Sequence, residues 1–151
     1  MLFARPTEYA IRALCRLASQ EPGALLGARE ISRSERLPMP FLWKILQVLK
    51  KGKVIRSRKG IGGGYELAAP PDRITLGAVA HLTEGTDFRQ NCALGLSRCN
   101  NRKPCRLHRQ WKEIRGDISG MLDETSLADL VRAGGTKPRA GKRRRAANSD
   151  C

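Results

Sequence analysis

The chain has 151 residues, the size of one domain with appendages, and its 29 lysines and arginines against 14 aspartates and glutamates leave a net charge of +15. Its hydrophobic content of 40% can build a core, which excludes a wholly disordered polycation. No apolar run approaches the roughly 20 residues of a membrane helix, and charges interrupt the N-terminus where a signal peptide is apolar, so we expect a cytoplasmic protein outside the membrane.

The positive charge is unevenly distributed along the chain. Residues 1–60 hold 13 basic and 4 acidic side chains, residues 61–130 hold 9 of each, and residues 131–151 hold 7 basic and 1 acidic. Basic side chains therefore concentrate in the segment that is expected to fold into helices. This distribution favours nucleic acid over anionic lipid as the partner.

Three helices are predicted in the first 60 residues. Thr7 is expected to cap the first helix, which runs for about 12 residues. The second spans residues 28–34, and the third opens with Pro40 at its first position and ends at Gly52 as a C′ residue. The apolar stripe of the third helix comprises Leu42, Ile45, Leu46 and Leu49. Two short helices around a tight connection, the second basic on its outer face, indicate a helix-turn-helix.

Two strands follow the third helix, at residues 54–58 and 65–68, around a glycine-rich tip. No Gly-Lys-Ser/Thr follows the glycines, which argues against a phosphate-binding loop, whereas a basic hairpin fits a wing that contacts DNA. We therefore predict a mainly α fold with a small β-hairpin wing, a winged helix-turn-helix over residues 1–70 that binds duplex DNA. The expected DNA-binding residues are Pro40, Phe41, Trp43, Lys44, Lys50, Lys51, Arg58 and Lys59. Taken singly, each lysine could equally belong to a solvated face.

The second half, residues 71–133, is predicted to contain a sensor loop and a dimerisation helix. Thr75 caps a helix that Gly85 ends, with Ile74 and Val79 as a hydrophobic staple. A long helix from about Arg106 carries a 4, 3, 4, 3 apolar seam that suits pairing with an identical chain. The seam residues are Leu107, Trp111, Ile114, Ile118 and Met121, although they could also face their own domain. Residues 134–151 form a basic tail that is expected to be disordered.

The polar segment between these helices has the pattern C-x6-C-x5-C-x2-H. The three thiolates of Cys92, Cys99 and Cys105 and the imidazole of His108 are donors for tetrahedral zinc or an iron–sulfur cluster. No paired C-x2–4-C knuckle is present, so the longer spacing favours a larger inorganic core. The interleaved cations, which would offset an anionic cluster, are Arg98, Arg102, Lys103, Arg106 and Arg109. Free thiols are the alternative, and Cys15 is interpreted as a small core residue.

The wing sequence GIGGGY at 60–65, the helix-turn-helix, the three-cysteine loop and the closing SLADLV together resemble the Rrf2 family of bacterial regulators, of the iron–sulfur cluster regulator and nitric-oxide-sensing repressor type. The resemblance spans residues 1 to about 132. It implies a homodimeric repressor with crossed C-terminal helices and an iron–sulfur cluster held by Cys92, Cys99 and Cys105. His108 matches a histidine ligand of the family, and Glu8, reaching over from a partner subunit, is the alternative fourth ligand.

Two positions depart from the family pattern. Six residues separate Cys92 from Cys99, where five are common, and the start of the reading helix does not match the family's better-known reading residues. The operator sequence therefore does not carry over, whereas the histidine favours a 2Fe–2S cluster over 4Fe–4S.

The leading hypothesis is a cluster-controlled repressor that binds DNA as a homodimer. The alternative is a thiol-redox switch or a zinc-stabilised DNA-binding regulator without a cluster. An enzyme is not expected, because only His81 and His108 could act as bases and no nucleophile motif is present.

Overall fold

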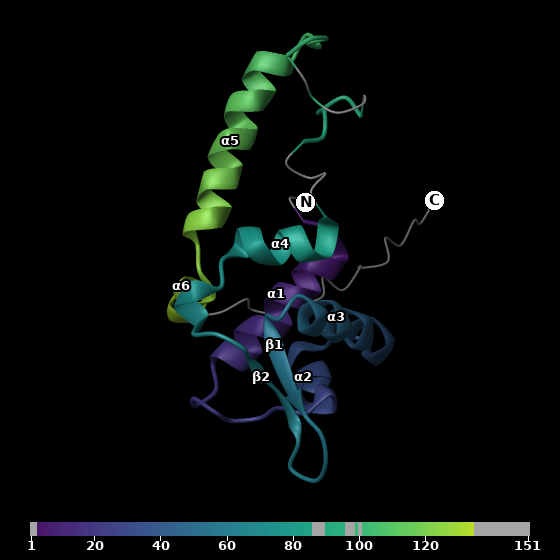
Figure 1. Cartoon of the computed structure of the whole chain (residues 1–151), viewed down its shortest axis with the longest axis vertical. Helices are drawn as coiled ribbons and strands as arrows, with labels where there is room; N and C mark the ends of the chain where they lie inside the picture. Colours follow the sequence, from purple (N-terminus) through teal and green to yellow (C-terminus); the bar gives the residue numbers. More distant parts are fainter. Residues whose placement is uncertain (1–2, 86–89, 96–98, 100, 135–151) are drawn as a thin grey trace, which may run out of the picture.

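The computed structural model describes residues 3–85, 90–95, 99 and 101–134 (Figure 1). Within these residues the chain forms helices around one short antiparallel hairpin, which confirms the predicted fold class. The elements in chain order are α1 (Arg5–Ala18), α2 (Ala28–Glu35), α3 (Met39–Lys51), β1 (Ile55–Arg58), β2 (Gly64–Leu67), the 3-10 helix η1 (Pro71–Arg73), α4 (Leu76–Glu84), α5 (His108–Glu124) and α6 (Leu127–Arg132).

Helix α1 is the central element, and α3, α4 and α6 all pack against it (Figure 1). Its buried side chains recur at helical spacing and include Ala10, Leu14 and Leu17. The predicted cap at Thr7 is wrong: the helix already begins at Arg5, because Pro6 is well tolerated in a first turn. Thr7 is instead fully buried and joins α1 to α4, since its hydroxyl donates to Glu84 Oε1 at 2.6 Å.

The α2–α3 pair forms the predicted helix-turn-helix. Arg36 ends α2 in the left-handed conformation (φ 52°), and the stripe predicted for α3 is buried as expected. Two details differ from the prediction: Pro40 is the second residue of α3, and Gly52 has φ −75° while Lys53 takes the left-handed conformation (φ 57°). A Cβ atom at position 52 would lie 2.7 Å from the end of the Leu82 side chain, so a larger residue there would require that side chain to move.

The hairpin projects away from the helices at the end of the molecule opposite α5 (Figure 1). Its strands pair from Ile55 opposite Leu67 to Arg58 opposite Gly64. Leu26 adds a bridge to β2, exchanging two backbone hydrogen bonds with Tyr65 at 3.0 and 2.8 Å. This bridge joins the part of β2 next to the tip to the loop before α2, so the wing and the helix-turn-helix are held together.

Helices α4 and α6 complete the core with capped N-termini. The Thr75 hydroxyl accepts the Ala78 N–H at 3.2 Å, and Ile74 and Val79 are both buried, as a staple requires. The sequence predicts a last short helix capped by Thr125 or Ser126, and in the structure the cap is Ser126, which forms a capping box with Asp129. Hydrogen bonds from Ser126, with Arg132 adding a further contact, lower the pKa of Asp129 to about 2.

Helix α5 extends from this body as a long arm (Figure 1). It begins at His108 rather than near Arg106, with Leu107 as its N-cap, and Leu122 is its one buried residue. No helix among the described residues is both long and apolar enough to cross a bilayer. The tail prediction falls on residues 135–151, which lie outside the described residues. The domain boundary at residue 70 stays a prediction, although α4 and α6 share the core of α1.

Candidate nucleic-acid interface and cysteine loop

The outer face of α3 combines cationic and large apolar side chains. Phe41 and Trp43 are 56% and 46% exposed, and Lys44, Lys50 and Lys51 are exposed beside them. Because Leu42, Ile45, Leu46 and Leu49 use the opposite face for the core, the helix presents these groups to solvent without loss of packing. The face thus offers phosphate-binding charges together with apolar groups that can contact base edges.

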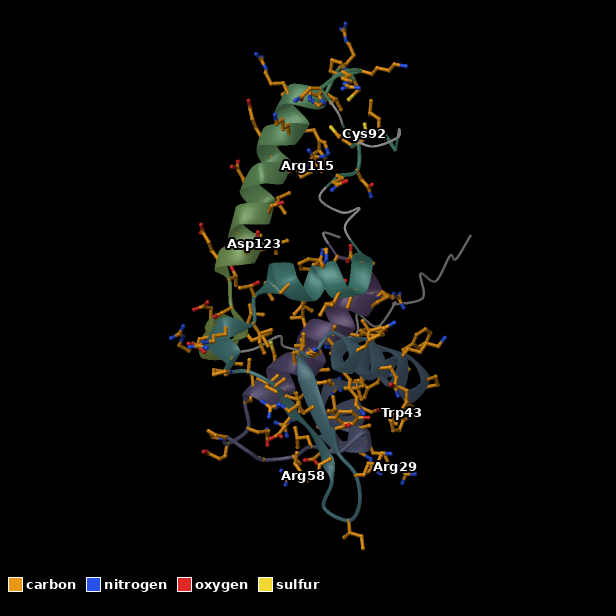
Figure 2. The ribbon with its side chains drawn as sticks, viewed as in Figure 1. Arg29, Trp43, Arg58, Cys92, Arg115 and Asp123 are labelled. Carbon is orange, nitrogen blue, oxygen red and sulfur yellow. The ribbon has the colours of Figure 1, made fainter. Side chains whose placement is uncertain are left out.

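The cationic surface also includes α2 and the hairpin. Arg29 and Arg33 are exposed on α2, and Arg58 and Lys59 are exposed at the end of β1. Figure 2 shows Arg29, Trp43 and Arg58 at the hairpin end of the molecule. The arginines of α2 were missed in the sequence interpretation. Their position on the helix face away from the buried Ile31 is the signal that could have identified them.

Arg12 joins the first helix to the end of α2. Its guanidinium lies 3.8 Å from the Glu8 carboxylate and 3.7 Å from that of Glu35, and it donates a hydrogen bond to the Glu35 carbonyl. Glu8, the alternative fourth ligand, is therefore paired within its own chain. These contacts hold the end of α2, where the turn of the helix-turn-helix begins, against α1. Neither the amphipathic pattern nor any sequence motif indicated them.

The four candidate ligands lie in two pairs, with the three cysteines in the loop before α5 and His108 at the first residue of α5. Cys92 and Cys105 have their sulfur atoms 3.8 Å apart, and the Cys99 sulfur lies 3.2 Å from His108 Nδ1. The other ring nitrogen of His108, Nε2, is 2.8 Å from the Asn101 side-chain oxygen, a contact that orients the imidazole. Sequence spacing could not show this pairing, because Cys92 and Cys105 are the outermost two of the three cysteines.

The Cys92–Cys105 pair has the spacing of two thiolates on one tetrahedral metal, whereas the Cys99 sulfur and His108 Nδ1 lie at hydrogen-bond distance. Two thiolates at about 2.3 Å from a tetrahedral ion lie about 3.8 Å apart, which the Cys92–Cys105 distance matches. Among the residues that the structure describes, no three histidine, cysteine or acidic side chains surround a single point where one ion could bind. Within the described residues the four donors thus form two separate pairs rather than one site with four converging ligands.

The loop is fastened to the first turns of α5. The Asn91 carbonyl accepts hydrogen bonds from Trp111 Nε1 at 2.9 Å and from Arg115 at 3.3 Å. Cys92, next in the chain, is only 8% exposed, and Figure 2 shows it beside Arg115 at the far end of the molecule from Trp43. The candidate DNA surface and the cysteine loop therefore occupy opposite ends of one chain.

The cations predicted around the cysteines lie on an open surface. Arg102, Lys103, Arg106 and Arg109 are all exposed, whereas Arg98 lies outside the described residues. Cys15 has a different environment in the core of α1, where burial, with a contribution from Glu35, raises the pKa of its thiol to about 11. The neutral, inaccessible Cys15 thiol fits the structural role that its sequence context indicated. His81 is exposed on α4.

The predicted seam of α5 divides into two parts. Ile118 packs against the hydrophobic core of its own chain, and Trp111 is half-buried against the loop. Leu107, Ile114 and Met121 are between 41% and 52% exposed within the part of the chain that the structure describes. The seam continues the core outward along α5 and leaves an apolar strip uncovered.

Comparison with known proteins gives one consistent result. Residues 3–133 match the model of the Rrf2 family, described as iron-dependent transcriptional regulators. A protein of Aquifex aeolicus, whose name assigns it to the HTH-type transcriptional regulators, is 32% identical over 133 residues, which cover 87% of this chain and 92% of that protein. The HTH-type transcriptional regulator IscR of Aliivibrio salmonicida is 28% identical over 123 residues, covering 82% of this chain and 73% of that protein.

Among solved structures, CymR, the global cysteine regulator of B. subtilis, superposes with a TM-score of 0.73. The match covers 87% of this chain and 96% of CymR at 22% identity, which supports the shared fold.

Proposed function

Because the chain belongs to the Rrf2 family of transcriptional regulators, we propose that it is a homodimeric repressor whose hold on operator DNA is controlled by a 2Fe–2S cluster in the cysteine loop. The relatives in Aquifex aeolicus and Aliivibrio salmonicida are both named as HTH-type transcriptional regulators, which supports a regulator rather than an enzyme. The proposal assigns DNA binding to one end of the molecule and sensing to the other.

The observation that carries the sensor proposal is the pairing of the four donors. Cys92 with Cys105 would hold one iron, and Cys99 with His108 would hold the other. When bound, such a cluster supplies a group that oxidants, nitric oxide or iron shortage can remove. Three thiolates against a core of charge about +2 leave about one negative charge, which the neighbouring Arg102, Lys103, Arg106 and Arg109 can offset.

For DNA binding we propose that α3 lies in a major groove and the hairpin contacts the adjacent minor groove and phosphates. Trp43 and Lys44, near the helix N-terminus, would face base edges, with Pro40 and Phe41 at the entry to the groove. The expected phosphate contacts are Lys50, Lys51, Arg58 and Lys59, joined by Arg29 and Arg33 of α2.

Assembly would place the uncovered strip of α5 against the same strip of a second chain. Leu107, Ile114 and Met121 supply exposed apolar area that a two-fold contact would remove from water. Two reading heads at a fixed separation can then bind two half-sites one DNA turn apart. Trp111 and Ile118 would support the strip from inside each chain.

The route from the loop to the DNA surface in one chain runs along α5. The loop is bonded to the first turns of α5 through Asn91, and the last turns of α5 enter the core through Ile118 and Leu122. A change in the loop can therefore alter how α5 leaves the body, and so the spacing of two heads joined by that helix. Coupling of about 1–3 kcal/mol is typical of linked sites.

The test is an anaerobic gel-shift titration on one operator with three samples: cluster-loaded protein, cluster-free protein, and a variant with Cys92, Cys99 and Cys105 replaced by alanine. We expect the loaded protein to be coloured and its affinity to differ from the other two by about 5- to 150-fold. Equal affinities in all three samples would leave a DNA-binding regulator without a cluster switch.

A cluster-free thiol switch is the second candidate, and the Cys92–Cys105 separation of 3.8 Å favours it specifically. Two thiols this close can be oxidised by a peroxide to a disulfide, with the peroxide reduced to water and alcohol. Colourless protein whose operator affinity responds to peroxide, and whose Cys92→Ser variant does not, would support this alternative. Colourless protein with stoichiometric zinc would instead indicate the zinc-stabilised form.

A further inference from the structure

The tip of the hairpin displays a single apolar side chain, Ile61. Ile61 is fully exposed, more so than any other large apolar residue among those described. A single exposed apolar residue is common on protein surfaces and needs no explanation by itself. What distinguishes Ile61 is the structure that presents it.

Ile61 occupies a turn that points it outward. The Gly63 N–H donates to the Gly60 carbonyl at 3.0 Å, which closes a four-residue turn with Ile61 at its second position. Gly62, at the third position, has φ 74°, as a type II turn requires. The outward direction of the isoleucine is thus set by backbone geometry rather than by packing.

The glycines around Ile61 make the tip both narrow and fixed. Gly60, Gly62 and Gly63 carry no side chains, so only Ile61 adds width to the loop beyond Arg58 and Lys59. A Cβ atom on Gly63 would lie 2.3 Å from the Arg58 carbonyl oxygen, so the two sides of the loop are too close for any residue other than glycine at position 63. A slim loop of this kind suits the minor groove of B-DNA, which is about 6 Å wide.

The cationic side chains beside the tip could bind the phosphates of the DNA segment that α3 contacts. Arg58 and Lys59 precede the turn and are exposed, and the hairpin lies at the same end of the molecule as Trp43 of α3 (Figure 2). With α3 in a major groove, the tip would meet the neighbouring minor groove flanked by phosphates. An apolar side chain in that position could contact the apolar parts of the base edges and sugars that line the groove.

We propose that Ile61 enters the minor groove as an apolar wedge and makes the regulator select a deformable base step beside the segment that α3 reads. This inference rests on the proposed DNA binding by the hairpin. Isoleucine is among the residues that part stacked bases from the minor groove, and pyrimidine–purine steps such as TA part most easily. Ile61 is thus a specificity-determining residue, whereas Arg58 and Lys59 add affinity for any sequence.

The experiment begins with selection of preferred sites from a randomised duplex library by the full-length wild-type protein. Two duplexes that differ only at the flanking step, TA against GG, are then titrated with wild type, Ile61→Ala, Ile61→Met and Lys59→Ala over a range of salt concentrations. Because the Ile61 side chain is fully exposed, the Ile61→Ala variant is expected to melt at the wild-type temperature.

We expect wild type to prefer the TA duplex by about 5-fold or more, the lower end of what one base pair contributes. Ile61→Ala should reduce the preference below about 2-fold without changing the salt slope, and Ile61→Met should retain it. Lys59→Ala should weaken both duplexes alike and lower the salt slope by about 1.

An unchanged step preference in Ile61→Ala, or no preference in wild type, would overturn the assignment of Ile61 while DNA binding itself stands. Failure of the wild-type protein to bind any duplex would overturn the proposed function and the inference with it.

Discussion

The body formed by α1–α4, the hairpin and α6 differs from the α5 arm in how far its apolar side chains are buried within the chain. In the body, the stripes of α1, α2 and α3 meet in one core, where Leu14, Ile31 and Leu46 are almost completely buried. In the arm, Leu122 alone is buried, and Ile114 and Met121 remain half exposed. Amphipathic pattern therefore identifies an apolar face equally well in both regions, but only the tertiary structure shows which face the chain can cover by itself.

The largest expected effect comes from a charge on the uncovered strip. Ile114→Asp should produce monomers in sedimentation experiments, because a carboxylate would be buried without a partner in the contact between two copies. Loss of the second reading head should weaken operator binding by about 100-fold or more. Lys112→Asp is the matched control, since Lys112 is exposed on the other side of α5 and should leave the dimer intact. A wild-type protein that is monomeric at micromolar concentration would contradict this prediction.

The next prediction compares two neighbouring residues of α5. Leu122→Ala should lower the free energy of unfolding by about 2–5 kcal/mol, because it opens a cavity where the arm enters the core. Met121→Ala should have little effect on the same free energy. Each change is made separately in the Ile114→Asp background, which removes any contribution from a partner chain. Urea denaturation followed by circular dichroism measures both. Equal losses for the two variants would mean that α5 packs on the body through a different face.

A smaller effect is expected at the charged surface of the body. Lys50→Ala and Lys51→Ala should each weaken binding to all duplex sequences and reduce the dependence of log affinity on log salt by about 1. Trp43→Ala and Lys44→Ala should instead change the preference among sequences, since the proposed complex would place both residues at base edges. If the Lys50/Lys51 double variant had the salt dependence of wild type, the orientation assigned to α3 would be wrong.

The smallest effect concerns Cys15 and pH. Its pKa is about 11 in the folded protein, whereas a thiol in an unfolded chain titrates near about 8.5. Since the unfolded chain loses this proton first, the stabilisation from Cys15 is complete below about pH 8.5 and is lost as pH rises towards 11. Denaturant unfolding across this window should show a steeper decline for wild type than for Cys15→Ala. The same decline in both would show that other groups dominate the alkaline limb.

Several elements could be predicted from the chain alone because their signals are local. The stripe of α3, the Thr75 cap with its staple, and the Ser126 cap each depend on residues three to five positions apart, and all three occur in the structure. The hairpin was predictable for the same reason, since its strands are joined by a short glycine-rich turn. Helix ends were less accurate: Thr7 matched a cap in composition, but a buried partner on α4 gives it a different role.

What the sequence determined by itself, then, is which residues carry the chemistry: basic side chains on α3 and the hairpin, and three cysteines with a histidine in one loop. The tertiary structure alone decided how they are grouped. It paired Cys92 with Cys105 and Cys99 with His108, placed that loop at the far end from the candidate DNA surface, and joined Arg12 of α1 to Glu35 at the end of α2. The physical reason is range: caps and stripes depend on neighbours within one or two turns, whereas these groupings join side chains through the packing of separate elements, which no local spacing encodes.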